Sequence, residues 1–139
     1  MKVKLTSELT EKLTDSGLAP HQLASDFGIW HADPTGPYAY YFGKDALNRG
    51  SSVLRHVHMI PHKDEKAVEK WDYLYDNDRQ CTSDRYLFYV DGEKYGHLLI
   101  AIIDNPKGHK IWEPTPSNRK MLAAWESIAS DFLYFGKSV

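Results

Sequence analysis

Three histidines lie close together in the segment LRHVHMIPHK, residues 54–63. If this segment is a strand, His56 and His58 lie on one face, because successive side chains of a strand point to opposite faces. Such a pair binds a metal when a third ligand converges on it, and His62 and His109 are candidates for that ligand. The pair can instead move protons near neutral pH, or the rings can pack at a sheet edge. The spacing alone leaves all three interpretations open.

A second group of reactive side chains follows the apolar segment that ends at Asp104. Lys107, His109 and Lys110 come shortly after it in the segment NPKGHK. Gly108 between them lets the backbone approach a ligand closely. Cleavage of a phosphodiester needs cations that hold the phosphate and an imidazole that moves a proton. The segment therefore predicts a phosphodiester site, with a basic surface turn as the alternative.

Further charged candidates lie elsewhere in the chain. Lys63 directly follows the three histidines, and Asp84 and Arg85 open the segment SDRYLFYV at an expected strand start. The two cations would bind phosphate, whereas the simpler interpretation of Asp84 and Arg85 is a turn-capping carboxylate beside an exposed cation. The sequence has no glycine-rich phosphate loop, GxSxG, HExxH or CxxC motif, which argues against a kinase, a serine hydrolase and a zinc protease.

Composition narrows the class of protein. The chain has 139 residues, of which 42% are hydrophobic, so we expect a folded domain with its own core. A single cysteine, Cys81, favours a reducing compartment. No run of about 18 apolar residues is present and the first residues lack a signal-peptide pattern, so we expect a cytoplasmic protein with no membrane span. The formal net charge of −2 is low for a binder of duplex DNA, although basic residues cluster locally.

The order of elements predicts an α+β fold, with helices packed on a small, mostly antiparallel sheet. We expect one domain over residues 1–139, with a strand and helices in 1–32, core strands in 53–104 and a last helix over 117–135. The apolar run before Asp104 is typical of a central strand that is covered on both faces.

Several local details follow from the same patterns. We expect a further helix over residues 64–76 and a turn at Gly43. Thr6 or Ser7 can cap the first helix, and Ser117 or Asn118 the last. The predicted core stripe of the last helix is Met121, Trp125, Ile128 and Phe132.

Five segments together resemble a known family. YYFGKDALN, HVHM, SDRYLFYVDG, HLLIAIIDNPKGHK and NRKMLAAWESIASDF occur in the order found in the YafO toxins, the toxin halves of bacterial type II toxin–antitoxin modules. The resemblance covers roughly residues 27–132. It implies a ribosome-dependent endoribonuclease, or mRNA interferase, that inhibits translation, uses no metal or other cofactor, and is held inactive by a cognate antitoxin protein. It also implies a fold like that of the RelE and ParE toxins.

The resemblance and the chemistry together give the predicted site, with the ribosome and mRNA as further partners. The expected reaction is attack of a ribose 2′-OH on the adjacent phosphate. Matching positions also include Lys44 and Asp45 of FGKDAL. The predicted catalytic residues are His58, His109, His56 and Asp84, and the predicted phosphate-binding residues are Lys63, Arg85, Lys107 and Lys110.

Two other functions remain open at this level. A non-nucleolytic toxin or interaction module of similar fold would act on another cellular target, such as a topoisomerase, and would arrest growth without loss of mRNA. A metal-dependent enzyme would use the three histidines of HVHMIPH as ligands.

Overall fold

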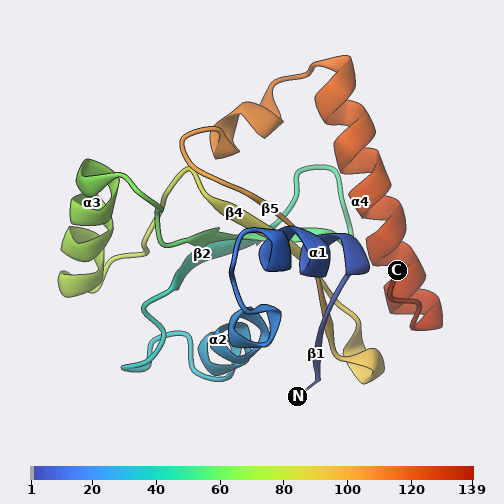
Figure 1. Ribbon diagram of the computed structural model, residues 1–139, viewed down its shortest axis with the longest axis horizontal. Coiled ribbons are helices and arrows are strands. Elements are labelled where there is room, and N and C mark those ends of the chain that lie inside the picture. The colour runs from blue at the N-terminus through green and yellow to red at the C-terminus, as the bar shows by residue number, and fades with distance from the viewer. Residues whose placement is uncertain (1) are drawn as a thin grey trace.

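The computed structural model describes residues 2–139, which form helices packed on one five-stranded sheet (Figure 1). The strands lie in the order β1-β5-β4-β3-β2. They are β1 (Val3–Leu5), β2 (Phe42–Leu47), β3 (Arg55–Met59), β4 (Tyr86–Asp91) and β5 (His97–Ile103). The helices are α1 (Ser7–Asp15), α2 (Pro20–Ala32), α3 (Glu65–Asp76) and α4 (Pro116–Phe135), with short 3-10 helices η1 (Glu93–Tyr95) and η2 (Gly108–Trp112).

The sheet is mixed, because β1 runs parallel to β5 while the other neighbouring strands are antiparallel. The predicted α+β fold with a mostly antiparallel sheet is therefore confirmed. The apolar run before Asp104 is β5, which lies between β1 and β4 as expected of a central strand. The structure is compatible with a RelE- or ParE-like fold, and that likeness stays a prediction. None of the helices within residues 2–139 is long and apolar enough to cross a membrane.

Each face of the sheet has its own apolar core. One face packs Val57, Leu87 and Leu99 against α1 and α2, including the fully buried Phe27. The other face packs Phe88 and neighbouring residues against α4. Figure 1 shows α4 along one side of the sheet and α3 at the opposite side of the view. The alternation of strand side chains separates the two cores, and it places His56 and His58 on the α4 face, beside Phe88 and Tyr86.

The predicted turn at Gly43 is wrong, because this glycine lies inside β2. A Cβ atom there would lie 2.1 Å from the carbonyl oxygen of Cys81, and the N–H of Lys44 donates to that oxygen at 2.9 Å. The segment around Cys81 therefore passes close against β2. Gly43 serves this close approach of two backbones rather than a change of direction.

The beginning of α4 also differs from the prediction. The hydroxyl of Thr115 accepts a hydrogen bond from the N–H of Asn118 at 3.1 Å, so Thr115 is the N-cap and neither Ser117 nor Asn118 has that role. The amide of Asn118 instead donates to the carbonyls of Lys110 and Glu113, which ties η2 to α4. At α1 the predicted choice resolves to Thr6, whose hydroxyl accepts from the N–H of Leu9.

The predicted core stripe of α4 is right at three of its four positions. Phe132 is fully buried, and Trp125 and Ile128 pack against the same core. Met121 is 39% exposed, so its assignment to the core is wrong. The amide of Asn118 ties the first turn of α4 to η2, and the residue next to Met121, Leu122, packs against the core.

Candidate functional site

Three strand ends meet at one end of the sheet. His58 at the end of β3 pairs with Tyr86 at the start of β4, and Tyr86 in turn pairs with Ile103 at the end of β5. The segment before β4 and the segment after β5 therefore both lie at the end of the sheet where the histidine strand ends. The ring centroids of His56 and His58 are 6.1 Å apart on the α4 face. The predicted sharing of one face is thus observed.

The ring of His56 is held in one tautomer. Its Nδ1 donates to Oδ1 of Asn48 at 2.6 Å, which leaves Nε2 as an acceptor. Asn48 is itself buried, and its backbone N–H donates to the carbonyl of Leu54. Burial, and after it the neighbouring His58, lower the pKa of His56 to about 4. His56 is therefore neutral at physiological pH and acts there as a hydrogen-bond acceptor.

His58 is anchored through Nδ1 to the backbone of Ser83, whose N–H lies at 3.0 Å and whose carbonyl oxygen lies at 2.9 Å. A ring with its proton on Nε2 accepts from this N–H, whereas a ring with a proton on Nδ1 donates to the carbonyl. In the second arrangement Nε2 carries no proton and is free to take one up. Burial lowers the pKa of His58, so the ring is neutral at pH 7. These properties suit a general base.

His109 reaches the same end of the sheet because η2 packs against the start of β4. The N–H of the buried Gly108 donates to the carbonyl of Asp84 at 2.9 Å. The Nδ1 atom of His109 then lies 3.5 Å from Oδ1 of Asp84, with both side chains about half exposed. A pocket of about 240 Å³ beside this pair is lined by His58, Asp84 and Lys70, among others. Asp84 therefore links His109 to the pocket of His58.

The predicted phosphate-binding cations fall into two groups. Lys107 and Lys110 flank His109 and are exposed. Arg85 instead donates to Asp104 at 2.8 Å and to the carbonyl of Ile60, and its side chain is 11% exposed.

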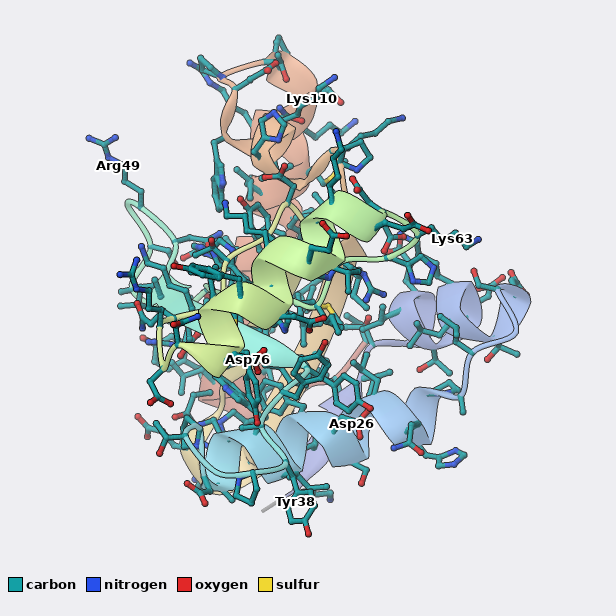
Figure 2. The ribbon with its side chains drawn as sticks, turned by 90° about the vertical axis from the view of Figure 1, so that its left-hand side faces the viewer. Asp26, Tyr38, Arg49, Lys63, Asp76 and Lys110 are labelled. Atoms are coloured by element: carbon teal, nitrogen blue, oxygen red, sulfur yellow. The ribbon has the colours of Figure 1, made fainter. Side chains whose placement is uncertain are left out.

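Arg85 shares a hollow with Lys63 and Lys12 on the α1 side of the sheet. Figure 2 shows Lys110 on η2 and Lys63 well below it in the view, before α3. The structure thus places Lys107 and Lys110 next to His109 on η2, and Arg85 and Lys63 in the hollow on the α1 side.

Comparison with protein families matches residues 29–134 to the family described as Toxin YafO, type II toxin-antitoxin system. The chain belongs to this family. Comparison with curated proteins and with solved structures found no match. The matched range contains all of the predicted site residues, and membership in a type II family implies a cognate antitoxin as partner. The predicted resemblance is therefore confirmed as to family and toxin role.

A ligand set for a metal does not form in the part of this YafO-family toxin that the structure describes. Within residues 2–139, no three side chains of the histidine, cysteine, aspartate and glutamate types converge as metal ligands. His62, one suggested third ligand, belongs to a loop whose backbone pairs with the amide of Asn105. The other, His109, is directed to Asp84.

The structure adds two aromatic residues that sequence reasoning missed as site residues. The Tyr86 ring lies 4.9 Å from that of His58, and the Trp112 ring lies 4.9 Å from that of His56, between ring centroids. Burial raises the pKa of Tyr86, so its hydroxyl stays protonated. Tyr86 belongs to a strand segment rich in aromatic residues, and that pattern predicts a core residue rather than a site residue. Trp112 follows GHK by two residues, and its proximity to that motif was the available signal.

Proposed function

We propose that this YafO-family toxin is a metal-independent endoribonuclease that cuts mRNA in association with the translating ribosome. Cleavage would inhibit translation until the cognate antitoxin binds. The observation that carries the proposal is the position of His58 and the Asp84–His109 pair at the same end of the sheet. A base that is neutral at pH 7 and a second imidazole beside a carboxylate are the two proton carriers that the reaction requires.

In the proposed reaction, Nε2 of His58 takes the proton of a ribose 2′-OH. The 2′-oxygen then attacks the adjacent phosphorus, so the O2′–P bond forms as the P–O5′ bond breaks. A protonated His109, oriented by Asp84, gives its proton to the departing 5′-oxygen. The products are a 2′,3′-cyclic phosphate and a 5′-hydroxyl end, and no metal ion takes part in the proposed reaction. Lys107 and Lys110 would neutralise the charge that develops on the phosphoryl oxygens.

The remaining predicted residues have supporting roles in this proposal. His56 would accept a hydrogen bond from the RNA through Nε2, because burial, and after it the neighbouring His58, lower its pKa to about 4 and leave the ring neutral. Lys63 and Arg85 line a different hollow from the pocket of His58, so we assign them to phosphates of the RNA or the ribosome farther from the scissile bond.

Two variants test the proton carriers. His58→Asn places a side-chain amide near the position of the imidazole Nδ1. His109→Gln replaces an exposed imidazole with an amide that cannot donate the proton. Each should lower cleavage by about 10²- to 10⁴-fold, which is the usual contribution of a general acid or base. The matched control is His21→Ala, an exposed histidine on α2. Growth arrest after induction, with 5′ ends mapped on a reporter transcript by primer extension, gives the readout, and co-purification with the antitoxin reports folding.

The chemistry predicts the ends of the fragments. Their 3′ ends should be extended by poly(A) polymerase only after the terminal phosphate is removed. Arrest that persists in the double variant of His58 and His109 would refute the imidazole mechanism. Arrest without new 5′ ends would instead support the alternative of a toxin that acts on another target.

A further inference from the structure

A groove of about 750 Å³ opens beside His56 on the α4 face of the sheet. The loop between β2 and β3 forms one wall, and η2 with the first turns of α4 forms the other. The hydroxyl of Ser51 donates to the carboxylate of Glu126 at 2.6 Å and joins the loop to α4 in the lining of the groove. The proposed reaction does not use this space.

Trp112 gives the groove an aromatic surface. Its side chain is 40% exposed although the ring packs near those of His56 and Tyr86. A tryptophan fixed by its neighbours and partly open to solvent can stack on a nucleobase with little loss of side-chain entropy. Of the four tryptophans, Trp30 and Trp71 are buried, and Trp125 packs in the core. Trp112 is thus the one placed to meet a ligand.

Two arginines give the groove positive charge. Arg49 comes from the β2–β3 loop and Arg119 from the first turns of α4, so they stand on opposite walls. Figure 2 shows Arg49 extending away from the loop into solvent. Neither arginine takes part in an ion pair within residues 2–139. Of the two glutamates in the lining, Glu126 already accepts from Ser51, and Glu113 lies beside Trp112.

We propose that this groove binds a nucleotide of single-stranded RNA next to the scissile phosphate, with the base stacked on Trp112 and the phosphate held by Arg49 and Arg119. The inference rests on the proposed nuclease function and names a subsite for its substrate. Continuity favours RNA over the antitoxin as occupant, since the His56 ring neighbours both His58 and Trp112. A strand that crosses His58 would reach Trp112 next. Stacking accepts any base, so this subsite contributes affinity more than sequence choice.

The test measures binding directly. The probe is a short oligoribonucleotide methylated at every 2′-oxygen, which cannot attack its own phosphates, and binding to the purified toxin is followed by fluorescence anisotropy. Trp112→Ala should weaken binding by about ten-fold or more, the size of one lost base stack. Trp112→Phe should retain most of the affinity. Arg49→Ala and Arg119→Ala should each weaken binding and flatten its salt dependence.

Control variants are available on the same helix. Lys120 is exposed next to Arg119 but does not line the groove, and Tyr134 is 65% exposed at the other end of α4. Lys120→Ala and Tyr134→Ala should bind the probe like the unmodified toxin. The arginine variants keep the test valid if Trp112→Ala fails to fold, because both arginines are exposed.

The outcomes separate this inference from the proposed reaction. Unchanged probe binding in the Trp112 and Arg119 variants overturns the groove as an RNA subsite, whatever the histidine variants do. If the Trp112 and Arg119 variants bind the probe more weakly while the His58 and His109 variants cleave RNA at the normal rate, the subsite is supported and the imidazole mechanism is refuted. Loss of antitoxin binding without loss of probe binding would make the groove an antitoxin contact, and the inference would be wrong.

Discussion

Gly108→Ala is the substitution that most directly tests how His109 is positioned. A Cβ atom at residue 108 would lie 1.9 Å from the carbonyl oxygen of Asp84 and 2.5 Å from its carbonyl carbon. Both atoms belong to the backbone, so no side chain can turn aside. To remove this clash, η2 and the backbone at Asp84 must separate by roughly 1 Å or more, given ordinary carbon–oxygen contact distances. The 2.9 Å hydrogen bond from the N–H of Gly108 to Asp84 would then be lost.

The expected cost combines two effects. Overpacking costs about 1–3 kcal/mol, and a lost backbone hydrogen bond about 0.5–1.5 kcal/mol. A loss of about 2–4 kcal/mol is a large share of a typical stability of roughly 5–15 kcal/mol. At about 3–5 °C per kcal/mol for a chain of this size, Tm should fall by about 6–20 °C. His109 would also move away from Asp84, and a misplacement of about 1 Å can lower the rate of the proposed cleavage about 10²-fold.

Thermal unfolding by circular dichroism and cleavage in a translation extract measure the two effects. Gly28→Ala is the matched control, because Gly28 lies within α2 and the nearest atom to its added Cβ is 4.0 Å away. Removing a glycine from a helix interior should leave stability unchanged or raise it by about 0.5–1 kcal/mol. A Gly108→Ala toxin with unchanged Tm and cleavage would refute the account of how η2 is seated.

Two further predictions concern stability. Thr115→Ala should destabilise α4 by about 1 kcal/mol while Ser117→Ala has little effect, because Thr115 is the N-cap; equal urea midpoints for the two variants would contradict this. His56 has a pKa of about 4 when folded, below its usual 6.5, so the unfolded state binds the proton first and stability falls as pH drops from 6.5 towards 4. His56→Gln should lose less stability across that window in urea titrations, and an unchanged pH dependence would argue against a buried, neutral His56.

Local pattern was enough for the framework of this protein. The alternation of side chains placed His56 and His58 on one face, and the long apolar run identified β5 as a central strand. The motif order pointed to the toxin family that residues 29–134 match. These features follow from periodicities and short motifs, which depend on residues that are near each other in the sequence.

The local sequence pattern could not predict which distant segments of the chain approach each other closely. Gly43 has the residue type of a turn, yet it lies within β2 because Cys81 passes against it. Gly108 was expected to let the backbone approach a ligand closely. In the structure, the lack of a side chain there lets the backbone approach the carbonyl oxygen of Asp84 instead. A glycine signals that space is needed, while the identity of the neighbour depends on the packing of the whole chain.

The amino-acid sequence by itself determined which residues could do chemistry, which strand carries the histidine pair, and to which family the toxin belongs. The tertiary structure decided which of them meet. Asp84 and Arg85 are neighbours in the sequence, but one faces His109 and the other is paired with Asp104 in a hollow on the α1 side. The Trp112 ring lies beside the His56 ring only because of how η2 packs in the folded chain. Burial lowers the pKa of both His56 and His58, and that burial depends on contacts between residues far apart in the chain.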